Sequence, residues 1–82
     1  MLNTKKVGAT IAFLRKNCGY SQEKLADLLS ISPQAISKWE NGHTLPETSL
    51  LPELAQIFGC SIDEILMSGY SAEEQKGAPI HT

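Results

Sequence analysis

Residues 21–42, SQEKLADLLSISPQAISKWENG, decide the fold of this 82-residue chain, because they predict two short helices joined by a tight turn. Ser21 is a suitable N-cap for the first of them, since its hydroxyl can accept a hydrogen bond from a free amide of the first turn. Apolar residues then follow at helical spacing and predict one buried face. That face consists of Leu25, Ala26, Leu28 and Leu29. The polar interruption at residues 30–32 predicts the turn.

A second short helix is predicted from Ser32 to about Asn41. Ser32 supplies another capping hydroxyl, and Pro33 suits the first helical position, where no amide hydrogen is needed. Gly42 can adopt the left-handed backbone conformation that ends a helix. Because successive residues lie about 100° apart around a helix, one thin apolar side is expected to pack inward. That side consists of Ala35, Ile36 and Trp39.

The outer side of this second helix carries the functional hypothesis. A side that is merely solvated usually mixes Glu and Lys, whereas this one offers mainly uncharged hydrogen-bonding groups of the kind that read base edges. Gln34 can donate to and accept from adenine, and Lys38 can reach guanine acceptors or a phosphate. The residues expected to contact DNA bases are Pro33, Gln34, Ser37 and Lys38. The alternative is a solvated helix without a partner.

The pattern continues on both sides of residues 21–42. Its positions are Arg15, Ser21-Gln22-Glu23-x-Leu25-Ala26, Ile31-Ser32-x-x-x-Ile36-Ser37-x-x-Glu40-x-Gly42, Pro46 and Leu54-Ala55. In these positions the chain resembles the Cro/CI-type (Xre) helix-turn-helix family of phage and bacterial repressors, over roughly residues 7–66. Two positions depart from the family. Ser30 stands where glycine is common, so the turn is either slightly strained or differs in backbone angle. Pro33 stands where a polar residue is usual, and proline offers only apolar contact.

The resemblance implies a lambda-repressor-like DNA-binding domain whose recognition helix lies in the major groove. It also implies an ion pair between Arg15 and Glu40 that links the first helix to the recognition helix. The alternative for Arg15 is a solvated cation near a helix C-terminus, where positive charge is favoured. Finally, it implies that Gln22 hydrogen-bonds a DNA phosphate while bracing a side chain of the recognition helix, at a helix start whose free amides favour anions. The alternative for Gln22 is an ordinary surface residue at the start of a helix.

Phosphate contacts are expected around the ends of these helices. We assign them to Gln22, Ser32, Asn41, His43 and Thr44. For His43 and Thr44 the alternative is an ordinary polar loop.

The rest of the chain predicts three further helices. The first follows a short lead at residues 1–4, covers residues 5–17 and buries a stripe formed by Val7, Ile11 and Leu14. The fourth begins at residue 48 or 49, tolerates Pro52 in its first turn and ends at Gly59. Its apolar side consists of Leu50, Leu51, Leu54, Ile57 and Phe58.

Ser61 and Glu64 form a capping box that opens a short fifth helix. Its residues Ile62 and Ile65 are expected in the core. In the family that the chain resembles, this region often forms a two-fold dimer contact, which implies such a role for Leu66 and Met67. The alternative is that these two residues complete the core. The chain is therefore predicted to be all-α, a compact bundle of five short helices over residues 1–67, followed by a flexible tail at residues 68–82.

Charge is divided unevenly along the chain. Residues 1–44 carry a net charge of +3, and residues 45–82 carry −5. The basic half contains the predicted DNA-reading unit, and such a division orients a protein toward a polyanion. The sequence has no apolar stretch of membrane-spanning length and no signal peptide, so we expect a soluble, cytoplasmic protein without a membrane partner.

Catalytic and metal-binding patterns are absent from the sequence. Cys18, Cys60, His43 and His81 lack the spacing of a zinc site, and we expect structural thiols, no metal and no cofactor. We find no paired carboxylates, no nucleophile-and-base constellation and no phosphate-binding glycine loop, so an enzyme is not expected.

Together these features predict a sequence-specific DNA-binding transcriptional regulator, with repression as the favoured output. Binding as a homodimer to a palindromic double-stranded operator would place half-site centres about 34 Å apart. The alternative is a protein-interaction module of the same fold, such as an antitoxin component with a protein partner, against which the short tail argues.

Overall fold

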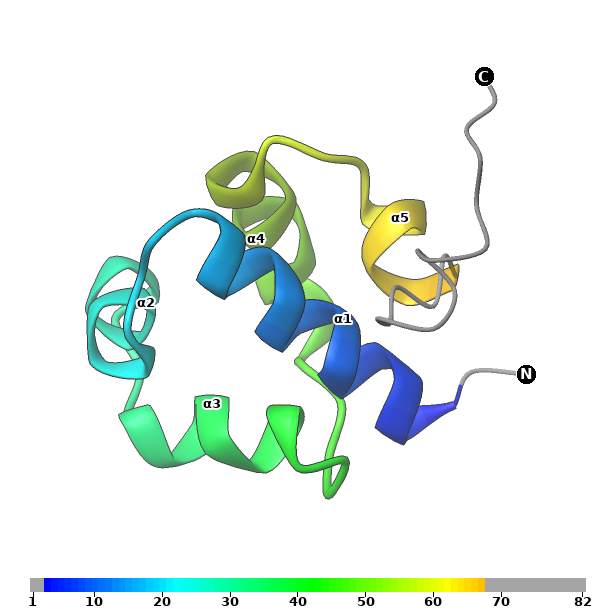
Figure 1. Cartoon of the computed structure of the whole chain (residues 1–82), viewed down its shortest axis with the longest axis horizontal. Helices are drawn as coiled ribbons and strands as arrows, with labels where there is room; N and C mark the ends of the chain where they lie inside the picture. Colours follow the sequence, from blue (N-terminus) through cyan, green and yellow to red (C-terminus); the bar gives the residue numbers. More distant parts are fainter. Residues whose placement is uncertain (1–2, 68–82) are drawn as a thin grey trace.

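The computed structural model describes residues 3–67, which form helices and their connecting turns. In chain order the elements are α1 (Thr4–Asn17), α2 (Gln22–Leu29), α3 (Pro33–Glu40), the 3-10 turn η1 (Thr48–Leu50), α4 (Leu51–Phe58) and α5 (Ile62–Met67). The predicted all-α fold of five short helices is confirmed (Figure 1). The predicted tail at residues 68–82 lies outside the described residues.

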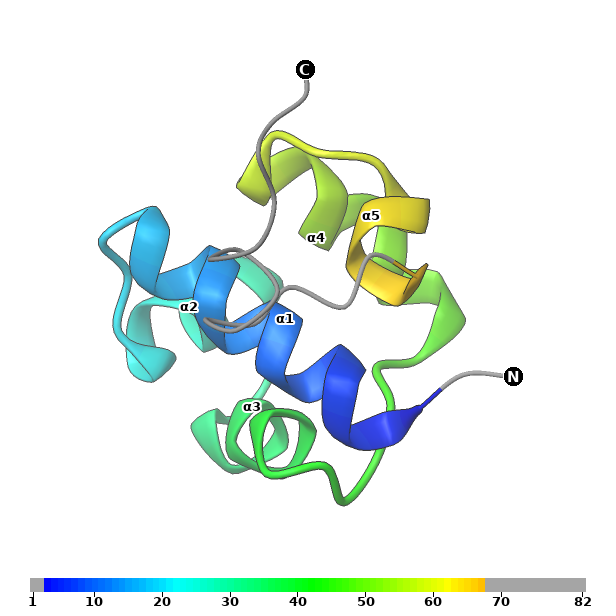
Figure 2. The ribbon, with the colours of Figure 1, turned by 45° about the vertical axis from the view of Figure 1, so that its right-hand side comes forward.

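Helix α1 lies across the middle of the molecule, between the α2–α3 unit on one side and the α4–α5 pair on the other (Figures 1 and 2). All five helices contribute to one buried apolar cluster. It consists of Val7, Ile11, Leu14, Leu25, Ala26, Leu29, Ile36, Trp39, Leu51, Leu54, Ala55 and Ile65. Burying one valine, leucine or isoleucine side chain stabilises a fold by about 1.5–3 kcal/mol. The α2–α3 unit is therefore fixed in place by its packing against α1 and the shared core.

The first helix starts at Thr4, one residue earlier than predicted, because Asn3 caps it. The Asn3 side-chain oxygen accepts a hydrogen bond from the Lys6 amide at 3.0 Å. Asparagine is among the best N-cap residues, so this signal was present in a stretch that the sequence analysis assigned to a lead. The predicted stripe of α1 is buried, together with Thr10, whose hydroxyl donates to the Lys6 carbonyl oxygen at 2.9 Å.

The turn between α2 and α3 contains Ser30 in the left-handed conformation, with φ of 60°. The Ser30 amide donates to the carbonyl oxygens of Ala26 and Asp27, and the Ile31 amide donates to that of Ala26 at 3.0 Å. These bonds satisfy carbonyls at the end of α2, as in helix ends that use glycine. A left-handed conformation costs a residue with a Cβ roughly 1–2 kcal/mol. The turn thus has the left-handed φ that glycine commonly adopts, and Ser30 is strained in this conformation.

The prediction that Leu28 belongs to the buried face of α2 is wrong. Its side chain is 43% exposed, while Leu25, Ala26 and Leu29 are buried. At 3.6 residues per turn, Leu28 lies about 100° from the centre of the stripe formed by these three residues. A helix of eight residues offers the core only a narrow stripe, so a residue at its edge stays in contact with water.

Helices α1 and α3 touch through their backbones at Gly8. A Cβ atom on Gly8 would collide with the carbonyl oxygen of Trp39. Gly8 is buried in the middle of α1, where glycine costs about 1 kcal/mol relative to alanine as a helix former. Glycine stands at this position because only a residue without a side chain lets the two helices approach this closely.

The fourth helix begins later than predicted, because Pro52 has no amide hydrogen. An α-turn starting at Thr48 would need a hydrogen bond from residue 52 to the Thr48 carbonyl oxygen. Instead the Leu51 amide donates to that oxygen, which gives the 3-10 turn η1, and α4 starts at Leu51 with Pro52 in its first turn. Gly59 ends α4 as predicted, with φ of 73°.

The capping box of α5 forms as predicted. The Glu64 side chain accepts from the Ser61 amide at 2.8 Å, and the Ser61 hydroxyl accepts from the Glu64 amide at 3.0 Å. Ile65 is fully buried. Leu66 is half-buried against the core, whereas Met67 is 66% exposed.

Neither a metal centre nor a membrane span is found in the described part of the chain. Within residues 3–67, no three His, Cys, Asp or Glu side chains gather as metal ligands, and no helix is long and apolar enough to cross a bilayer. Cys18 and Cys60 are free thiols. Burial, the charge of Glu64 and that of Cys18, in this order, raise the pKa of the Cys60 thiol. His81 lies outside the described residues.

Candidate nucleic-acid interface

The outer side of α3 is open to solvent. Pro33, Gln34 and Lys38 are exposed, and Ser37 is half-buried. Within residues 3–67, the side chains of Gln34 and Lys38 make no hydrogen bond or ion pair. The amide of Gln34 and the ammonium of Lys38 are thus available to a ligand without the loss of an internal bond.

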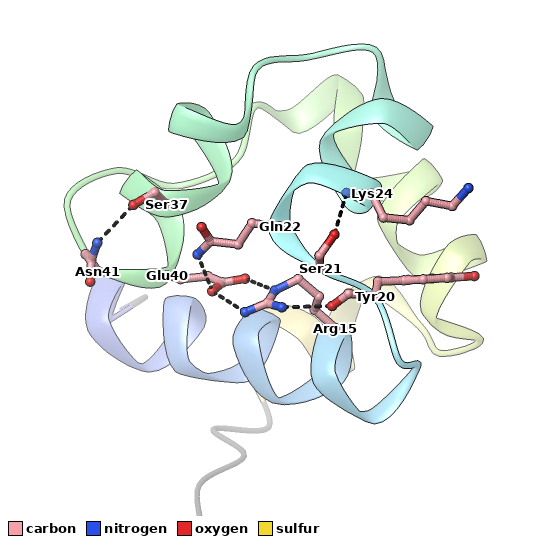
Figure 3. Close-up of polar contacts among 8 residues, drawn as sticks. All are labelled: Arg15, Tyr20, Ser21, Gln22, Lys24, Ser37, Glu40 and Asn41. Carbon is pink, nitrogen blue, oxygen red and sulfur yellow. Dashed lines mark hydrogen bonds and ion pairs between the residues drawn. The ribbon is translucent and has the colours of Figure 1, made fainter.

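Ser37 and Asn41 are joined on the same side of α3. The Asn41 side-chain amide donates to the Ser37 hydroxyl oxygen at 3.2 Å, across one turn of the helix (Figure 3). The bond leaves the Ser37 hydroxyl hydrogen, the second amide hydrogen of Asn41 and its carbonyl oxygen unused. The two residues can therefore still bind DNA, but they would do so as a pair held in one geometry.

The inner side of α3 is anchored by an ion pair between Arg15 of α1 and Glu40. Arg15 Nε donates to Glu40 Oε2 at 2.6 Å, and Nη2 donates to Oε1 at 2.9 Å (Figure 3). Only 10% of the Arg15 side chain and 8% of the Glu40 side chain are exposed. Hydrogen bonding to Glu40 raises the pKa of Arg15 against the opposing effect of burial. Arg15 Nη1 also donates to the Tyr20 carbonyl oxygen at 2.8 Å.

Gln22, the first residue of α2, is attached to the same carboxylate. Its side-chain amide donates to Glu40 Oε1 at 2.9 Å (Figure 3). The α3 side chain that Gln22 braces is thus Glu40, on the inner side of the helix and not on the outer side predicted to contact DNA bases. One amide hydrogen of Gln22 remains for a phosphate, and the bond to Glu40 fixes the direction of the amide group.

The remaining phosphate candidates lie at the two ends of α3. The Ser32 hydroxyl oxygen caps α3 by accepting from the Ala35 amide at 3.3 Å. His43 and Thr44 are exposed in the loop after α3. The His43 amide donates to the Lys38 carbonyl oxygen at 2.9 Å, so it already serves the end of the helix. A phosphate contact by His43 would have to use its side chain.

Lys5 is a further cation near the C-terminal end of α3, and it is not among the residues that the sequence predicts to contact DNA. A Cβ atom on Gly42 would lie 2.7 Å from Lys5 Cγ and 3.1 Å from Lys5 Cα. The first turn of α1 therefore packs on the turn that follows α3 (Figures 1 and 2). No local pattern joins residues this far apart in the sequence, so only the tertiary structure reveals the contact.

Comparison with known proteins places this arrangement in a family. A family model described as helix-turn-helix matches residues 11–65, two thirds of the chain. The chain belongs to the Xre-type helix-turn-helix family. Relatives of the chain carry the names of transcriptional regulators and repressors and not of enzymes, in agreement with the sequence-based prediction.

Relatives of this helix-turn-helix chain are bacterial and phage regulators. The competence pilus inhibition repressor of Acinetobacter baylyi is 38% identical over 61 residues, which are 74% of this chain and 56% of the repressor. The transcriptional regulator DicA of Escherichia coli is 33% identical over 73 residues, or 89% of this chain and 52% of DicA. The chain thus spans about half the length of these relatives. The ImmF control region 10 kDa protein of Bacillus phage phi105 is 32% identical over 77 residues, 94% of this chain and 86% of the phage protein.

Solved structures share the helix-turn-helix fold. The clp gene regulator ClgR of Corynebacterium glutamicum superposes with a TM-score of 0.75 at 22% identity, over 93% of this chain and 81% of ClgR. A hypothetical transcription factor NHTF from Neisseria superposes with a TM-score of 0.72 at 20% identity, over 90% of this chain and 82% of NHTF. At this level of identity the likeness establishes the fold alone.

Proposed function

We propose that this protein is a sequence-specific transcriptional repressor that reads double-stranded DNA with the outer side of α3. The observation that carries the proposal is the contrast in how α3 uses its polar groups. Glu40 fixes the inner side of the helix to α1 and α2, whereas Gln34 and Lys38 project outward without a protein partner in the described residues. A fixed helix with unbonded amide and ammonium groups suits insertion into the major groove.

Base reading is assigned to Pro33, Gln34, Ser37 and Lys38. The amide of Gln34 can form two hydrogen bonds with adenine, and the ammonium of Lys38 can donate to the O6 and N7 atoms of guanine. Ser37 can donate its hydroxyl hydrogen, since its oxygen already accepts from Asn41. Pro33 offers an apolar surface that suits the methyl group of thymine.

Phosphate contacts would position α3 in the groove. Gln22 and Ser32 lie at helix N-termini, where free amides favour anions. Asn41, His43 and Thr44 are exposed at the other end of α3. Contacts at both ends would fix the register of the protein on the duplex, because phosphate contacts set position and base contacts set preference.

A homodimer on a palindromic operator follows from the same proposal. Met67 is largely exposed at the end of α5, and Leu66 beside it is half-buried. An apolar pair at the end of a helix can pack against its copy across a two-fold axis. Two copies would then read half-sites about 34 Å apart. Bound in the cytoplasm over a promoter, the dimer would block transcription.

The test is selection of bound duplexes from a random library at a stated salt concentration, with the wild type and Gln34→Ala in parallel. We expect the wild type to enrich an inverted repeat. Gln34→Ala should lose roughly 1–3 kcal/mol of binding free energy and relax the preference at one base pair of each half-site. Glu53→Ala, an exposed carboxylate of α4, serves as the control that should leave the selected sequence unchanged.

Three other outcomes contradict parts of the proposal. An equal loss on every sequence with Gln34→Ala would leave Gln34 a packing or phosphate role. A single half-site in place of an inverted repeat would contradict the homodimer. If no sequence is enriched and binding vanishes at about 0.15 M salt, only charge attraction remains, and the fold is then a module that binds another protein.

A further inference from the structure

The contact between Lys5 and Gly42 brings a cation of α1 to the recognition helix. The Lys5 side-chain stem packs over Gly42 so closely that a Cβ atom on Gly42 would collide with it. Gly42 also adopts a left-handed φ of 78°. Glycine is therefore needed twice at this position. It permits the backbone angle that ends α3, and it leaves room for the Lys5 stem.

Packing explains the stem of Lys5 but not its charge. Lys5 is exposed, and within residues 3–67 it has no ion pair and no side-chain hydrogen bond. It lies in the first turn of α1, which contains no acidic residue. A cation near a helix N-terminus is disfavoured by the helix dipole, so α1 itself gives no reason for a lysine at this position.

We propose that Lys5 binds a DNA backbone phosphate beside the C-terminal end of α3. The inference rests on the proposed function and extends the interface to α1, from which the proposal above draws no DNA contact. The Lys5 stem lies against Gly42. Gly42 stands in the sequence between Asn41, whose side-chain amide bonds Ser37, and His43, whose side chain is exposed. An ammonium at the end of this stem adds a charge-assisted contact to the phosphates that this end of α3 faces.

The first experiment measures the salt dependence of binding to the selected operator. Lys5→Met removes the charge and keeps an apolar stem, Lys5→Arg keeps the charge, and Lys16→Met removes an exposed lysine from the opposite end of the same helix. Removing one phosphate contact should reduce the slope of log K against log salt by about 0.9. Between about 50 and 200 mM salt, the wild type should then lose about threefold more affinity than Lys5→Met. Lys5→Arg and Lys16→Met should keep the wild-type slope.

The second experiment identifies the phosphate. Neutral methylphosphonates are placed one at a time along the operator, and binding of the wild type is compared with that of Lys5→Met. One position should weaken the wild type and have no further effect on Lys5→Met, whose selected sequence should remain that of the wild type. The inference is overturned if Lys5→Met keeps the full slope, or if every methylphosphonate weakens both proteins equally. If the wild type itself enriches no sequence, the proposed function fails and this inference fails with it.

Discussion

The two sides of α3 differ in how completely their polar groups are bonded within the protein. On the inner side, the Glu40 carboxylate accepts from both Arg15 and Gln22, and the backbone of Trp39 touches Gly8. On the outer side, Gln34 and Lys38 bind nothing in the described residues. The residues that hold the helix in place are thus separate from those proposed to read DNA. We therefore expect that the stability of the fold and the proposed sequence preference can be changed independently.

Removal of Arg15 should have the largest effect on the inner side. Arg15→Ala leaves the Glu40 carboxylate nearly buried with Gln22 as its remaining partner, and loss of one member of such a pair costs about 3 kcal/mol. Urea denaturation measures this loss, with Lys16→Ala as the control, which should stay within about 0.5 kcal/mol of the wild type. Equal stability of the two variants would show that the pair does not hold α3 in place.

The pH dependence of this pair has a definite sign. The hydrogen bond to Glu40 raises the pKa of Arg15, so the stabilisation is fully present below the pKa of arginine in the unfolded chain. The contribution from the Arg15 charge is lost as the pH rises through this raised pKa, far above neutral pH. The stability difference between the wild type and Arg15→Ala should therefore show no loss from Arg15 titration between neutral pH and pH of about 10.

The backbone contact at Gly8 should give the next largest effect. Helix propensity alone predicts that Gly8→Ala stabilises the protein by about 1 kcal/mol. Because the added methyl group would collide with the Trp39 carbonyl oxygen, we expect destabilisation by about 2 kcal/mol instead. Thermal unfolding gives the sign, and Ala9→Gly at the exposed neighbouring position reports propensity alone. A more stable Gly8→Ala would mean that α1 and α3 can separate without cost.

The outer side should show the opposite behaviour. Lys38→Ala should weaken operator binding by roughly 1–3 kcal/mol if Lys38 reads guanine, yet change unfolding by less than about 0.5 kcal/mol. Operator binding and urea denaturation of one preparation test both statements. Destabilisation comparable to that of Gly8→Ala would abolish the distinction between the two sides.

The smallest effect is expected at the turn that leads into α3. Ser30→Gly removes left-handed strain but gives the unfolded chain more freedom, so a gain of roughly 0.5–1 kcal/mol should remain. The turn after α4 provides the matched control, because Gly59 has φ of 73° and the same pattern of amide bonds to the preceding helix. Gly59→Ser should lose a similar amount. An increase in stability that also alters operator preference would contradict the independence of scaffold and readers.

Local signals predicted most of the fold. The capping serines at 21, 32 and 61 and the glycines at 42 and 59 each act on their own helix end, so the sequence alone locates these boundaries. The predicted boundaries and faces differ from the structure at three places. Asn3 caps α1 from within the predicted lead, the missing amide hydrogen of Pro52 delays the start of α4, and Leu28 lies at the edge of a narrow buried stripe.

The site was less predictable, because its decisive contacts join distant parts of the chain. The outer residues of α3 follow from helical periodicity. That Gln22 bonds Glu40, that Gly8 meets Trp39 and that Lys5 crosses Gly42 depend on how the helices cross. The resemblance to a family supplied the Arg15–Glu40 pair, which periodicity could not have indicated. A sequence pattern predicts faces of single helices, whereas contacts between helices require the packed structure.

The close backbone contact at Gly8 also bears on the operator spacing that the proposed dimer would accept. Because α1 and α3 meet backbone to backbone at Gly8 and α1 also packs against α5, we expect the domain to bind DNA as one rigid unit. In the proposed dimer, the separation of the two recognition helices is then set by the subunit contact alone. One base pair inserted between half-sites shifts them by about 3.4 Å and turns them by roughly 35°. Two recognition helices held at a fixed separation cannot follow that change. We therefore expect binding of the proposed dimer to depend on the spacing of the half-sites as well as on their bases.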